Sequence, residues 1–495
     1  MSDALEKRIK KYIIGKPHRF LAISPLGFEQ TLARELDCIL GKNATEPPHV
    51  TGDGKVEFTT KLTEAWKAVA ISRIANRVLM EVASFKAENF RELEKKASEI
   101  PWELYLDERT GKALQTRDES IIPSNSKLVT SNLPHIHVTC KHSRLYHSDA
   151  IAERLYNVIA QSNIPQSEAN SEGKARPHTP KPDSSGDPIP QNLYVNFLDD
   201  RCTIWLDLAG EELYKRGFER FVNDAPLKET IASAMIFEAL HFLPSTSYCL
   251  LDLMSGSGTF SLEAACIANK IIPGTCRDFA LKHQPAFKEA TWNFLIRQET
   301  RDDKCVGRVS RPCLHEHDRV QHLGLERSDN PKTNSATATI AKILTSDISE
   351  RAVNIIKHNI ECSPLASISP APIAPQQKDF FSYTAKEIAD ICSDTSPVLV
   401  LNPPYGKRLD FDAPKLYTQI GKKLTELSHD LHNLGKTLTV AILAPKDDAR
   451  DGAKYTCTAN LLRECQALSP EHSPTTKVIQ TSHGGFSLNA FFATI

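Results

Sequence analysis

The stretch of residues 247–268 constrains the fold of this chain more than any other. Its sequence is SYCLLDLMSGSGTFSLEAACIA, in which an apolar run ends at Asp252, a loop carries Gly256 and Gly258, and a helical pattern begins near Thr259. A strand that is apolar on both faces is typical of a buried parallel sheet, in which helices connect the strands. We therefore expect an α/β fold with a doubly wound sheet in this part of the chain.

The same loop predicts a ligand-binding role. Its glycines allow the backbone to approach a ligand closely, and the helix that follows presents unpaired N–H groups at its first turn. The spacing matches neither G-x-x-x-x-G-K-[ST] nor G-x-G-x-x-G, so it does not favour a phosphate-binding loop. Asp252 stands four positions before Gly256. This arrangement suits a ligand with an amino group and no phosphate, and S-adenosylmethionine is such a ligand.

A second strand and helix are expected in KILTSDISERAVNIIKHNI, residues 342–360. The apolar run reaches Asp347, and Ser349 is a good N-cap for the following helix. A carboxylate at the end of the second strand of a doubly wound sheet is placed to accept hydrogen bonds from both hydroxyls of a ribose. Asp347 has an equally simple alternative role as a helix-start residue. Further along, QQKDFFSY offers Asp379 to an adenine amine and Phe380 to its ring face, although the preceding SISPAPIAP is a poor strand.

A third feature is LNPPYGKRL, residues 401–409, whose Asn and two prolines directly follow the apolar run Val398–Leu401. Two prolines end a strand firmly, because proline cannot donate to the hydrogen-bond ladder of a sheet. They leave an Asn and a Tyr at the strand end on a rigid loop. The alternative is a Pro-rich strand end with a surface Tyr, and the glycine loop upstream argues against it.

Before residue 220 the chain alternates α and β patterns. A short apolar strand at Phe20–Ile23 precedes a helix with one buried face, and LYVNFLDDRCTIWLDLAG predicts a hairpin that turns at Asp199–Asp200. No acid–base pair or nucleophile setting is apparent in this half. Basic residues do cluster here, and taken alone such clusters are most simply solvated surface. The basic residues of interest are Lys10, Lys11, Arg73, Arg77, Lys215 and Arg216.

Two polar stretches interrupt the folded pattern. Residues 162–190 and 299–336 are rich in Ser, Pro and charged residues, which predicts flexible loops. The second stretch holds Cys305 and Cys313 together with three histidines, His315, His317 and His322. No C-x-x-C partner accompanies them, so a polar insertion is favoured over a metal site and we expect no metal.

Length and composition set the wider limits. A chain of 495 residues is too long for one core of ordinary size, so two or three domains are expected. A formal net charge of -1 gives no global attraction to nucleic acid or membrane, and such contacts must come from local patches. The twelve cysteines lack framework spacing, the first residues lack a signal-peptide core, and no apolar run approaches the roughly 20 residues that span a bilayer. We expect a reduced, cytoplasmic protein without membrane contact.

The motifs together carry a family resemblance. DLMSGSGTF, SDISERAVNIIKHN and NPPYGKRL, in this order, resemble the motifs of class I S-adenosylmethionine-dependent methyltransferases that modify exocyclic amines. DLAGEELYKRGFER, APLKETIASAMI and IIPGTCRDFALKHQPAFKEATW resemble the THUMP-domain RNA methyltransferases, in particular the bacterial enzymes that methylate guanine N2 in 23S ribosomal RNA. The N-terminal LAISPLGFEQTLARELDCIL and SRIANRVLMEVASFKAENFRELEKKASEIPWELYL resemble the ferredoxin-like and THUMP portions of that family. The resemblance covers most of the chain outside the two polar stretches.

The resemblance implies a domain order. A ferredoxin-like part is expected over residues 1–60 and a THUMP-like RNA-binding domain over residues 61–215, with a loop at 162–190. A Rossmann-like class I methyltransferase domain is expected over residues 222–495, with an antiparallel last strand and a polar insertion at 299–336.

The resemblance also implies S-adenosyl-L-methionine as the cofactor and large-subunit ribosomal RNA or its precursor as the partner. The basic residues named above would hold RNA phosphates, which gives affinity without sequence choice. The implied cofactor-binding residues are Asp252, Met254, Gly256, Gly258, Thr259, Phe260, Asp347, Ile348, Asp379, Phe380, Pro226 and Lys228.

A catalytic role follows for Asn402, Pro403, Pro404 and Tyr405. The nitrogen of an aromatic amine is a poor nucleophile because its lone pair is delocalised into the ring. The Asn402 side-chain oxygen and the Pro403 carbonyl can each accept a hydrogen bond from the amine, which favours a pyramidal nitrogen directed at the methyl group. The prolines keep this loop rigid. Tyr405 can stack on the target base and offset part of the few kcal/mol that unstacking costs.

Three departures from the family and several alternatives remain. The departures are the two polar stretches, the weak strand before Asp379, and the lack of a second methyltransferase domain after Ile495, so guanine-N7 methylation is not expected. The same N-P-P-Y chemistry serves adenine N6, cytosine N4 and glutamine amides, and the THUMP-like half favours RNA. Transfer RNA is an alternative substrate. A non-catalytic RNA-binding or ribosome-assembly protein is the alternative outside enzymes.

Overall fold

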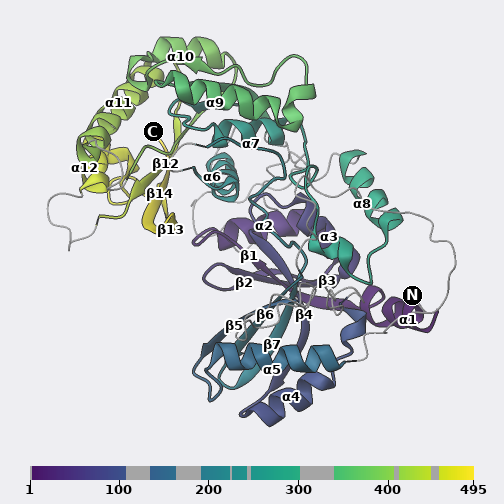
Figure 1. The fold of residues 1–495 in the computed structure, drawn as a ribbon. Coiled ribbons are helices and arrows are strands. Elements are labelled where there is room, and N and C mark those ends of the chain that lie inside the picture. The colour runs from purple at the N-terminus through teal and green to yellow at the C-terminus, as the bar shows by residue number, and fades with distance from the viewer. Residues whose placement is uncertain are drawn as a thin grey trace, which may run out of the picture.

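The computed structural model describes residues 3–106, 134–162, 191–222, 226–241, 247–301, 339–405, 412–447 and 456–495. Two seven-stranded sheets organise these residues, one built from the N-terminal half and one from the C-terminal half (Figure 1). The predicted polar stretches 162–190 and 299–336 lie almost wholly outside the described residues. The helix α8 (Glu289–Arg301) extends slightly into the second of them.

The first sheet begins with a β-α-β-β-α-β unit. Its strands lie in the order β2-β3-β1-β4, which is the ferredoxin-like arrangement. The predicted strand and helix near Phe20 are confirmed as β1 and α2. The unit runs to the end of β4 and so extends past residue 60, where the sequence divided it. Its elements are β1 (Pro17–Ile23), α2 (Glu29–Leu40), β2 (Ala44–Gly52), β3 (Lys55–Lys61), α3 (Leu62–Ile71) and β4 (Arg77–Lys86).

The same sheet continues without a break into the next region. Strand β4 pairs with β7, which pairs with β6, and β5 forms the far edge. The predicted hairpin is confirmed, since Asp199 and Asp200 both have positive φ between β6 and β7. The helices α4 and α5 pack against this end of the sheet (Figure 1). The elements are α4 (Phe90–Ser98), β5 (His135–Lys141), α5 (Ser148–Gln161), β6 (Asn192–Leu198) and β7 (Arg201–Asp207), and at the N-terminus α1 (Asp3–Ile9) with a π-helical turn at Lys10–Ile14.

The second sheet has the order β10-β9-β8-β11-β12-β14-β13. Strands β8 to β12 pair in parallel, and β14 is antiparallel to β12, as expected for the last strand. Strand β10 has only two residues, which agrees with the poor strand pattern before Asp379. The strands are β8 (Ser247–Asp252), β9 (Thr339–Asp347), β10 (Gln376–Gln377), β11 (Ser396–Leu401), β12 (Thr439–Pro445), β13 (Lys477–His483) and β14 (Phe486–Thr494).

Helices cover both faces of this sheet, which explains why its central strands are apolar on both sides. Residues Tyr248–Leu251 and Val398–Leu401 are fully buried. The Ser349 hydroxyl accepts a hydrogen bond from the Ala352 N–H and caps α9, as predicted. The helices are α6 (Glu229–His241), α7 (Thr259–Ala268), α9 (Glu350–Glu361), α10 (Ala385–Cys392), α11 (Ala413–Asn433) and α12 (Cys457–Glu464).

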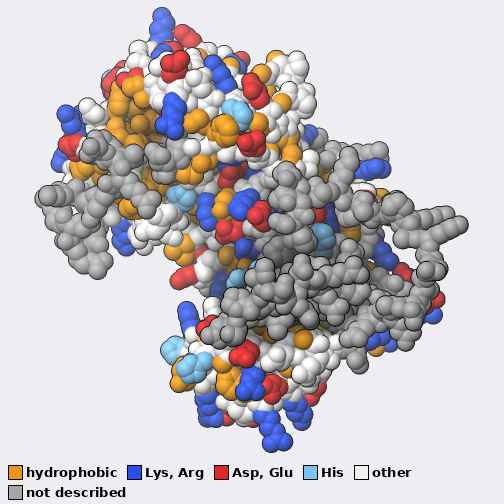
Figure 2. Space-filling model, viewed as in Figure 1, with side chains coloured by type: hydrophobic (Ala, Val, Ile, Leu, Met, Phe, Trp, Pro, Cys, Tyr) orange, Lys and Arg blue, Asp and Glu red, His pale blue; other side chains and the backbone are white. Residues whose placement is uncertain are grey.

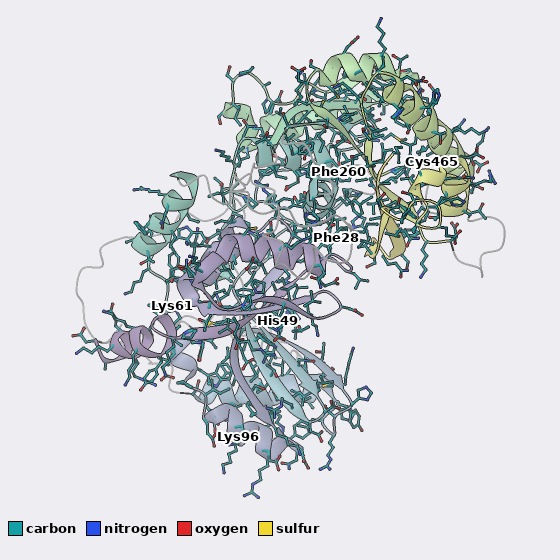
Figure 3. The ribbon with its side chains drawn as sticks, turned by 180° about the vertical axis from the view of Figure 1, so that it is seen from behind. Phe28, His49, Lys61, Lys96, Phe260 and Cys465 are labelled. Atoms are coloured by element: carbon teal, nitrogen blue, oxygen red, sulfur yellow. The ribbon has the colours of Figure 1, made fainter. Side chains whose placement is uncertain are left out.

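The two halves share one core. Phe28, which precedes α2, and Phe260, in α7, belong to a single buried cluster that crosses the junction (Figure 3). Helix α6 is buried around nearly its whole circumference, because it packs between the second sheet and α2 of the first half (Figure 1). A Cβ on Gly27 would lie 2.1 Å from the Gln480 carbonyl oxygen of β13, so this contact requires glycine.

Buried ion pairs also cross the junction. The Glu238 carboxylate of α6 accepts hydrogen bonds from Thr31 and Arg34 of α2 and, at 2.9 Å, from Lys477 of β13. Each charge is compensated where it leaves water, which a buried charge requires. The first half is therefore held against the second by matched polar contacts as well as by apolar packing.

Across the described ranges, no helix combines the length and the apolar character that crossing a membrane requires.

Candidate active site

A cavity of about 1020 Å³ opens at the carboxyl edge of the second sheet. Its walls come from the glycine loop after β8, the end of β9, the N-P-P-Y segment after β11 and the turn between β13 and β14. Residues 211–222 and 226–229, which connect β7 to α6, close one side. The carboxyl ends of parallel strands meet at one edge of a sheet, so residues far apart in sequence converge here.

The two loop glycines have different roles. Gly256 and Gly258 have φ of 56° and 77°, a region that favours glycine. Gly256 lines the cavity. Gly258 does not, and a Cβ there would lie 2.9 Å from the Ile356 side chain of α9. The expected close approach to a ligand therefore applies to Gly256, whereas Gly258 allows α7 and α9 to pack.

Asp347 lies in the cavity wall at the end of β9, as predicted. One carboxylate oxygen accepts the Gly256 N–H at 2.9 Å and the other accepts the Ser349 N–H at 2.9 Å. Each oxygen retains a second lone pair, because a carboxylate can accept about four hydrogen bonds. The two backbone bonds fix the carboxylate, so it can accept from a ligand without reorganising.

Asp252 has a different position from the one expected. Its side chain is buried, does not line the cavity, and accepts hydrogen bonds from the Ser261 N–H at 3.1 Å and the Ser261 hydroxyl at 2.6 Å. Burial, together with the nearby charge of Asp347 and against the Ser261 bonds, raises the pKa of Asp252 to about 7. The structure thus directs this carboxylate at Ser261 of α7 and not into the cavity wall, where the expected contact with an amino group of the ligand would have placed it.

The N-P-P-Y segment lines the cavity with all four residues, Asn402, Pro403, Pro404 and Tyr405. The Asn402 side-chain oxygen is buried and accepts no hydrogen bond from the described residues. The Pro403 carbonyl accepts a long hydrogen bond, 3.5 Å, from the Tyr417 hydroxyl, which leaves a lone pair available. Two acceptors are thus present on one rigid loop, and an unpaired buried acceptor is costly unless a ligand supplies a donor.

Tyr405 contacts a residue that the sequence did not indicate. Its ring meets Phe486 of β14 edge to face, with centroids 5.8 Å apart. Burial raises the pKa of the Tyr405 hydroxyl to about 12, so this residue is a neutral phenol. Both rings line the same cavity as Asn402.

His483, at the end of β13, is a second residue that the sequence reasoning missed. Its Nε2 bonds the Pro226 carbonyl at 2.8 Å, and its Nδ1 is buried without a partner among the described residues. Burial lowers the pKa of His483, and the Pro226 bond opposes this shift. With Nε2–H donating, Nδ1 holds a lone pair, so the cavity wall carries a further neutral acceptor. Only the antiparallel pairing of β13 with β14 brings it here, and no local motif marks it.

Arg220 is a further residue of the cavity wall that the sequence motifs did not mark. Its guanidinium donates to the Thr259 hydroxyl at 2.8 Å and pairs with Glu229. Burial lowers the pKa of Arg220 to about 10, although nearby Glu263 raises it. Arg220 lines the cavity and ties its connecting segment to the start of α7.

The other expected cofactor residues divide into two groups. Met254, Thr259, Phe260, Ile348, Pro226 and Lys228 all line the cavity. Asp379 and Phe380 do not. Asp379 caps a short 3-10 helix by accepting the Phe381 N–H at 3.0 Å, and Phe380 is buried in the core beneath α10. The structure therefore does not place this pair in the cavity wall, and their adenine contacts stay a prediction.

Two of the expected RNA-binding residues are buried in ion pairs instead. Arg73 and Arg216 both bond the Glu263 carboxylate of α7, at 3.3 Å and 3.1 Å, and both are nearly inaccessible to solvent. Burial by itself would raise the pKa of Glu263, but the two guanidinium charges outweigh it and the pKa is lowered. These arginines join the two halves of the molecule and are not available to a phosphate.

Arg77 is also paired with a carboxylate, whereas the remaining expected RNA-binding residues are exposed. Arg77 bonds the Asp207 carboxylate at 2.6 Å and the Gly210 carbonyl at 2.7 Å. Lys10 and Lys11 are exposed. Lys215 is half exposed at the cavity, within 3.0 Å of Glu211. Lys and Arg side chains also gather where α4 lies, at the end of the molecule remote from the second sheet (Figure 2). The exposed cations of α4 are Arg91, Lys95 and Lys96.

Two family models match parts of the chain. Residues 216–435 match the methyltransferase domain described as RMKL-like, and residues 19–79 match the RlmL ferredoxin-like domain. These two segments of the chain are therefore similar to an RMKL-like methyltransferase domain and to an RlmL ferredoxin-like domain. The resemblance drawn from the motifs is confirmed at this level. The methyltransferase match covers the glycine loop, Asp347 and the N-P-P-Y segment, so the cavity lies largely within this domain.

Curated relatives extend the match to most of the chain. The ribosomal RNA large subunit methyltransferase K/L of Allochromatium vinosum is 27% identical over 419 residues, which is 83% of this chain and 46% of the relative. The chain thus spans about half the length of this relative. The protein named "Putative RNA methyltransferase YpsC" of Bacillus subtilis is 26% identical over 415 residues, covering 83% of this chain and 86% of the relative.

Solved structures agree in fold. SMU.472, a methyltransferase-like protein crystallised in complex with SAH, superimposes with a TM-score of 0.62 at 19% identity, covering 97% of this chain and 98% of the other. The arrangement of the two sheets is therefore shared over nearly the whole length.

Proposed function

We propose that this protein transfers a methyl group from S-adenosyl-L-methionine to the exocyclic N2 amine of a guanine in large-subunit ribosomal RNA. The observation that carries the proposal is the unpaired Asn402 oxygen, which shares one cavity with the glycine loop and with Tyr405. A hydrogen-bond acceptor, an aromatic platform and a nucleoside-type pocket at one strand edge are the parts that amine methylation requires.

The cavity residues fit the proposed cofactor. Asp347 offers two oriented carboxylate oxygens to ribose hydroxyls, Gly256 permits close backbone approach, and Ile348, of which 66% is exposed, offers an apolar face to adenine. SMU.472, which shares the fold, was crystallised with SAH. The bound cofactor would supply an electrophilic methyl group on a sulfonium.

The remaining chemistry belongs to the N-P-P-Y loop. Asn402 and the Pro403 carbonyl would accept the two amine hydrogens, so that the nitrogen lone pair is directed toward the methyl group. Tyr405 and Phe486 would hold the base plane. Neither Tyr405, a neutral phenol, nor Asn402 can act as a strong general base. The alkylated amine is acidic enough to release its proton to water or a carbonyl.

The choice of substrate rests on the relatives. Those with the printed name ribosomal RNA large subunit methyltransferase K/L support ribosomal RNA, and an N-terminal half with exposed cations on α4 and near Lys10 suits a phosphate backbone. Guanine N2 as the target atom follows from the motif resemblance. We assign the reaction to the cytoplasm, in keeping with free cysteines throughout the described residues.

The decisive experiment is transfer of tritium from labelled S-adenosylmethionine to RNA, followed by digestion to nucleosides and chromatography. Naked large-subunit RNA, assembly particles and transfer RNA are tested side by side, with the Asn402→Ala variant as the inactive control. We expect label in N2-methylguanosine of large-subunit RNA. Label in N6-methyladenosine would retain the mechanism and overturn the base. Label in transfer RNA alone would overturn the substrate, and cofactor binding without any transfer would favour a binding or assembly role.

A further inference from the structure

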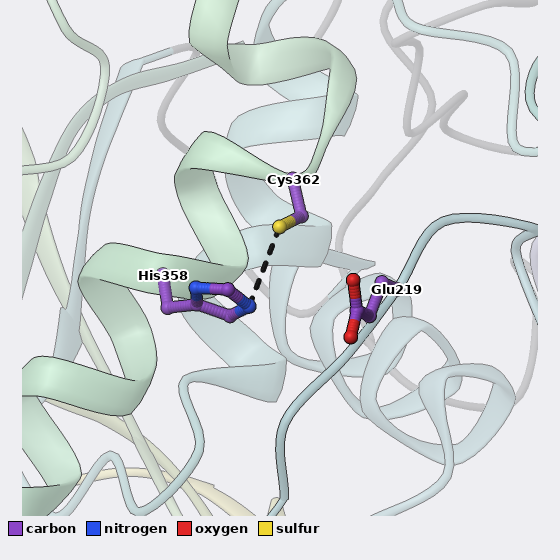
Figure 4. A group of neighbouring side chains, drawn as sticks. All are labelled: Glu219, His358 and Cys362. Carbon is purple, nitrogen blue, oxygen red and sulfur yellow. Dashed lines mark hydrogen bonds between the residues drawn. The ribbon is translucent and has the colours of Figure 1, made fainter.

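A cluster of three metal-ligating side chains lies outside the cavity. Glu219, His358 and Cys362 each offer one donor atom, and these atoms lie within 4.8 Å of one another (Figure 4). His358 lies in the last turn of α9 and Cys362, four residues later, is the C-cap of this helix with a helical backbone conformation, so both project from the same face. Glu219 faces them from the segment that connects β7 to α6. None of the three has a role in the cavity described above.

The donor set and its spacing suit zinc. Thiolate, imidazole and carboxylate are the ligands that Zn²⁺ takes in proteins. The Cys362 Sγ lies 3.4 Å from the His358 Nε2. Two such ligands on a tetrahedral zinc would be about 3.6 Å apart, given its usual bond lengths to sulfur and nitrogen. A thiolate and a carboxylate would together balance the charge of a divalent ion.

The surroundings hold the ligands in place without the ion. The His358 ring stacks on Phe221, with centroids 4.0 Å apart. Asn359, the next residue on α9, accepts the Phe221 N–H at 2.8 Å and donates to the Phe221 carbonyl at 2.9 Å. The backbone two residues from Glu219 is therefore fixed to α9. An ion would meet a largely ordered site, so little conformational entropy is lost on binding.

We propose that Glu219, His358 and Cys362 bind one Zn²⁺ ion through the carboxylate, Nε2 and Sγ, with water in the fourth position. The ion would join the connecting segment to α9. Arg220 and Val222 of this segment line the cavity, so the ion fixes one of its walls. The site goes beyond the proposed methyl transfer and does not depend on it.

The test is a metal titration of the full chain after treatment with a chelator. Cobalt(II) is added first, because a cobalt thiolate gives a charge-transfer band in the near ultraviolet, and zinc is then added to displace it. We expect one equivalent to bind. Cys362→Ser should abolish the band, and Glu219→Gln should weaken zinc binding by at least the roughly tenfold that loss of an outer-shell partner costs.

Two controls separate this site from other thiols. Cys276→Ser removes an exposed cysteine elsewhere and should leave the band unchanged. The double variant Cys305→Ser/Cys313→Ser, whose positions lie outside the described residues, should also retain it. A band that survives Cys362→Ser, disappears in the double variant or never forms would overturn the proposal and leave a cysteine–histidine hydrogen bond only. If Cys362→Ser fails to fold, Glu219→Gln is the deciding variant, because the Glu219 side chain is exposed. Unchanged zinc affinity in Glu219→Gln would count against the site.

Discussion

Polar side chains at the edge of the second sheet face a cavity, whereas arginines of the first half are paired with carboxylates inside the protein. At the carboxyl edge of the second sheet, Asp347 and Asn402 present acceptor atoms at a cavity. In the first half, Arg73 and Arg77 form ion pairs with carboxylates of the protein. Strand ends of a parallel sheet converge on one edge whatever the loops do, whereas the position of a basic residue near a domain junction depends on the partner that packs against it. A motif at a strand end is therefore a stronger guide to function than a cluster of cations.

The largest effect is expected from Glu263→Gln, which tests whether the buried arginines are structural. It removes the carboxylate that pairs with both Arg73 and Arg216, and breaking a buried ion pair typically costs about 3–5 kcal/mol. Thermal unfolding should occur at a markedly lower temperature. Glu211→Gln, which removes the exposed partner of Lys215, is the matched control and should change little. Equal stability of both variants would contradict the structural role.

Asn402→Ala tests the functional side of the comparison. The variant removes one positioned polar group at the reacting centre, so methyl transfer should fall by roughly a hundredfold or more. Cofactor affinity, measured by calorimetry, should be retained because Asn402 is assigned to the target base. Asn269→Ala, at an exposed position that follows α7, is the control. An equal loss of cofactor affinity would show that Asn402 is structural.

Asp347 and Asp252 end adjacent strands and allow a direct contrast. Asp347→Ala should weaken cofactor binding by roughly tenfold or more, the scale of a missing hydrogen bond to a charged group. Asp252→Asn should weaken it much less, since Asp252 does not line the cavity. Both affinities are measured by calorimetry on folded protein. A larger loss in Asp252→Asn would reverse the assignment.

The pH dependence of stability sharpens the same contrast. The pKa of Asp252 is about 7 in the folded protein, against an ordinary value of 3.8. A carboxyl group with a raised folded pKa contributes stability below the ordinary value and loses it as pH rises through about 7. The melting temperature of Asp252→Asn should therefore fall less between pH 5 and pH 8 than that of the parent. Parallel pH curves would show that Asp252 is ionised when folded.

The smallest effect is expected from the exposed cations of the first half. In Lys10→Ala/Lys11→Ala, the dependence of log affinity on log salt should decrease by about 0.7–0.9 for each RNA phosphate that the protein no longer neutralises. Filter binding at several salt concentrations measures it on the same RNA. Methyl transfer at saturating RNA should be unchanged. A salt slope identical to the parent would place the RNA elsewhere, for example on α4.

Local sequence was sufficient to predict the elements that build the site. The apolar runs before Asp252 and Asp347 are strands β8 and β9, Ser349 caps α9, and the prolines after Leu401 end β11. These features depend on side chains within a few residues of each other. Hydrophobic periodicity, a cap and a strand breaker act locally, so a single sequence exposes them.

Packing between elements decided which of these side chains reach the cavity. Asp347 and Asp252 both end apolar strands, but they differ in position. The Asp347 carboxylate lies in the cavity wall, whereas the Asp252 carboxylate is bonded to Ser261 of α7. His483 and Phe486 reach the cavity only because β14 inserts antiparallel beside β12 and carries β13 with it. Arg216 belongs to the segment that closes one side of the cavity, yet its guanidinium is paired with Glu263 at the junction. The sequence determined which residues could do chemistry, and the tertiary structure selected among them, because burial and partnership depend on which elements pack together in the fold.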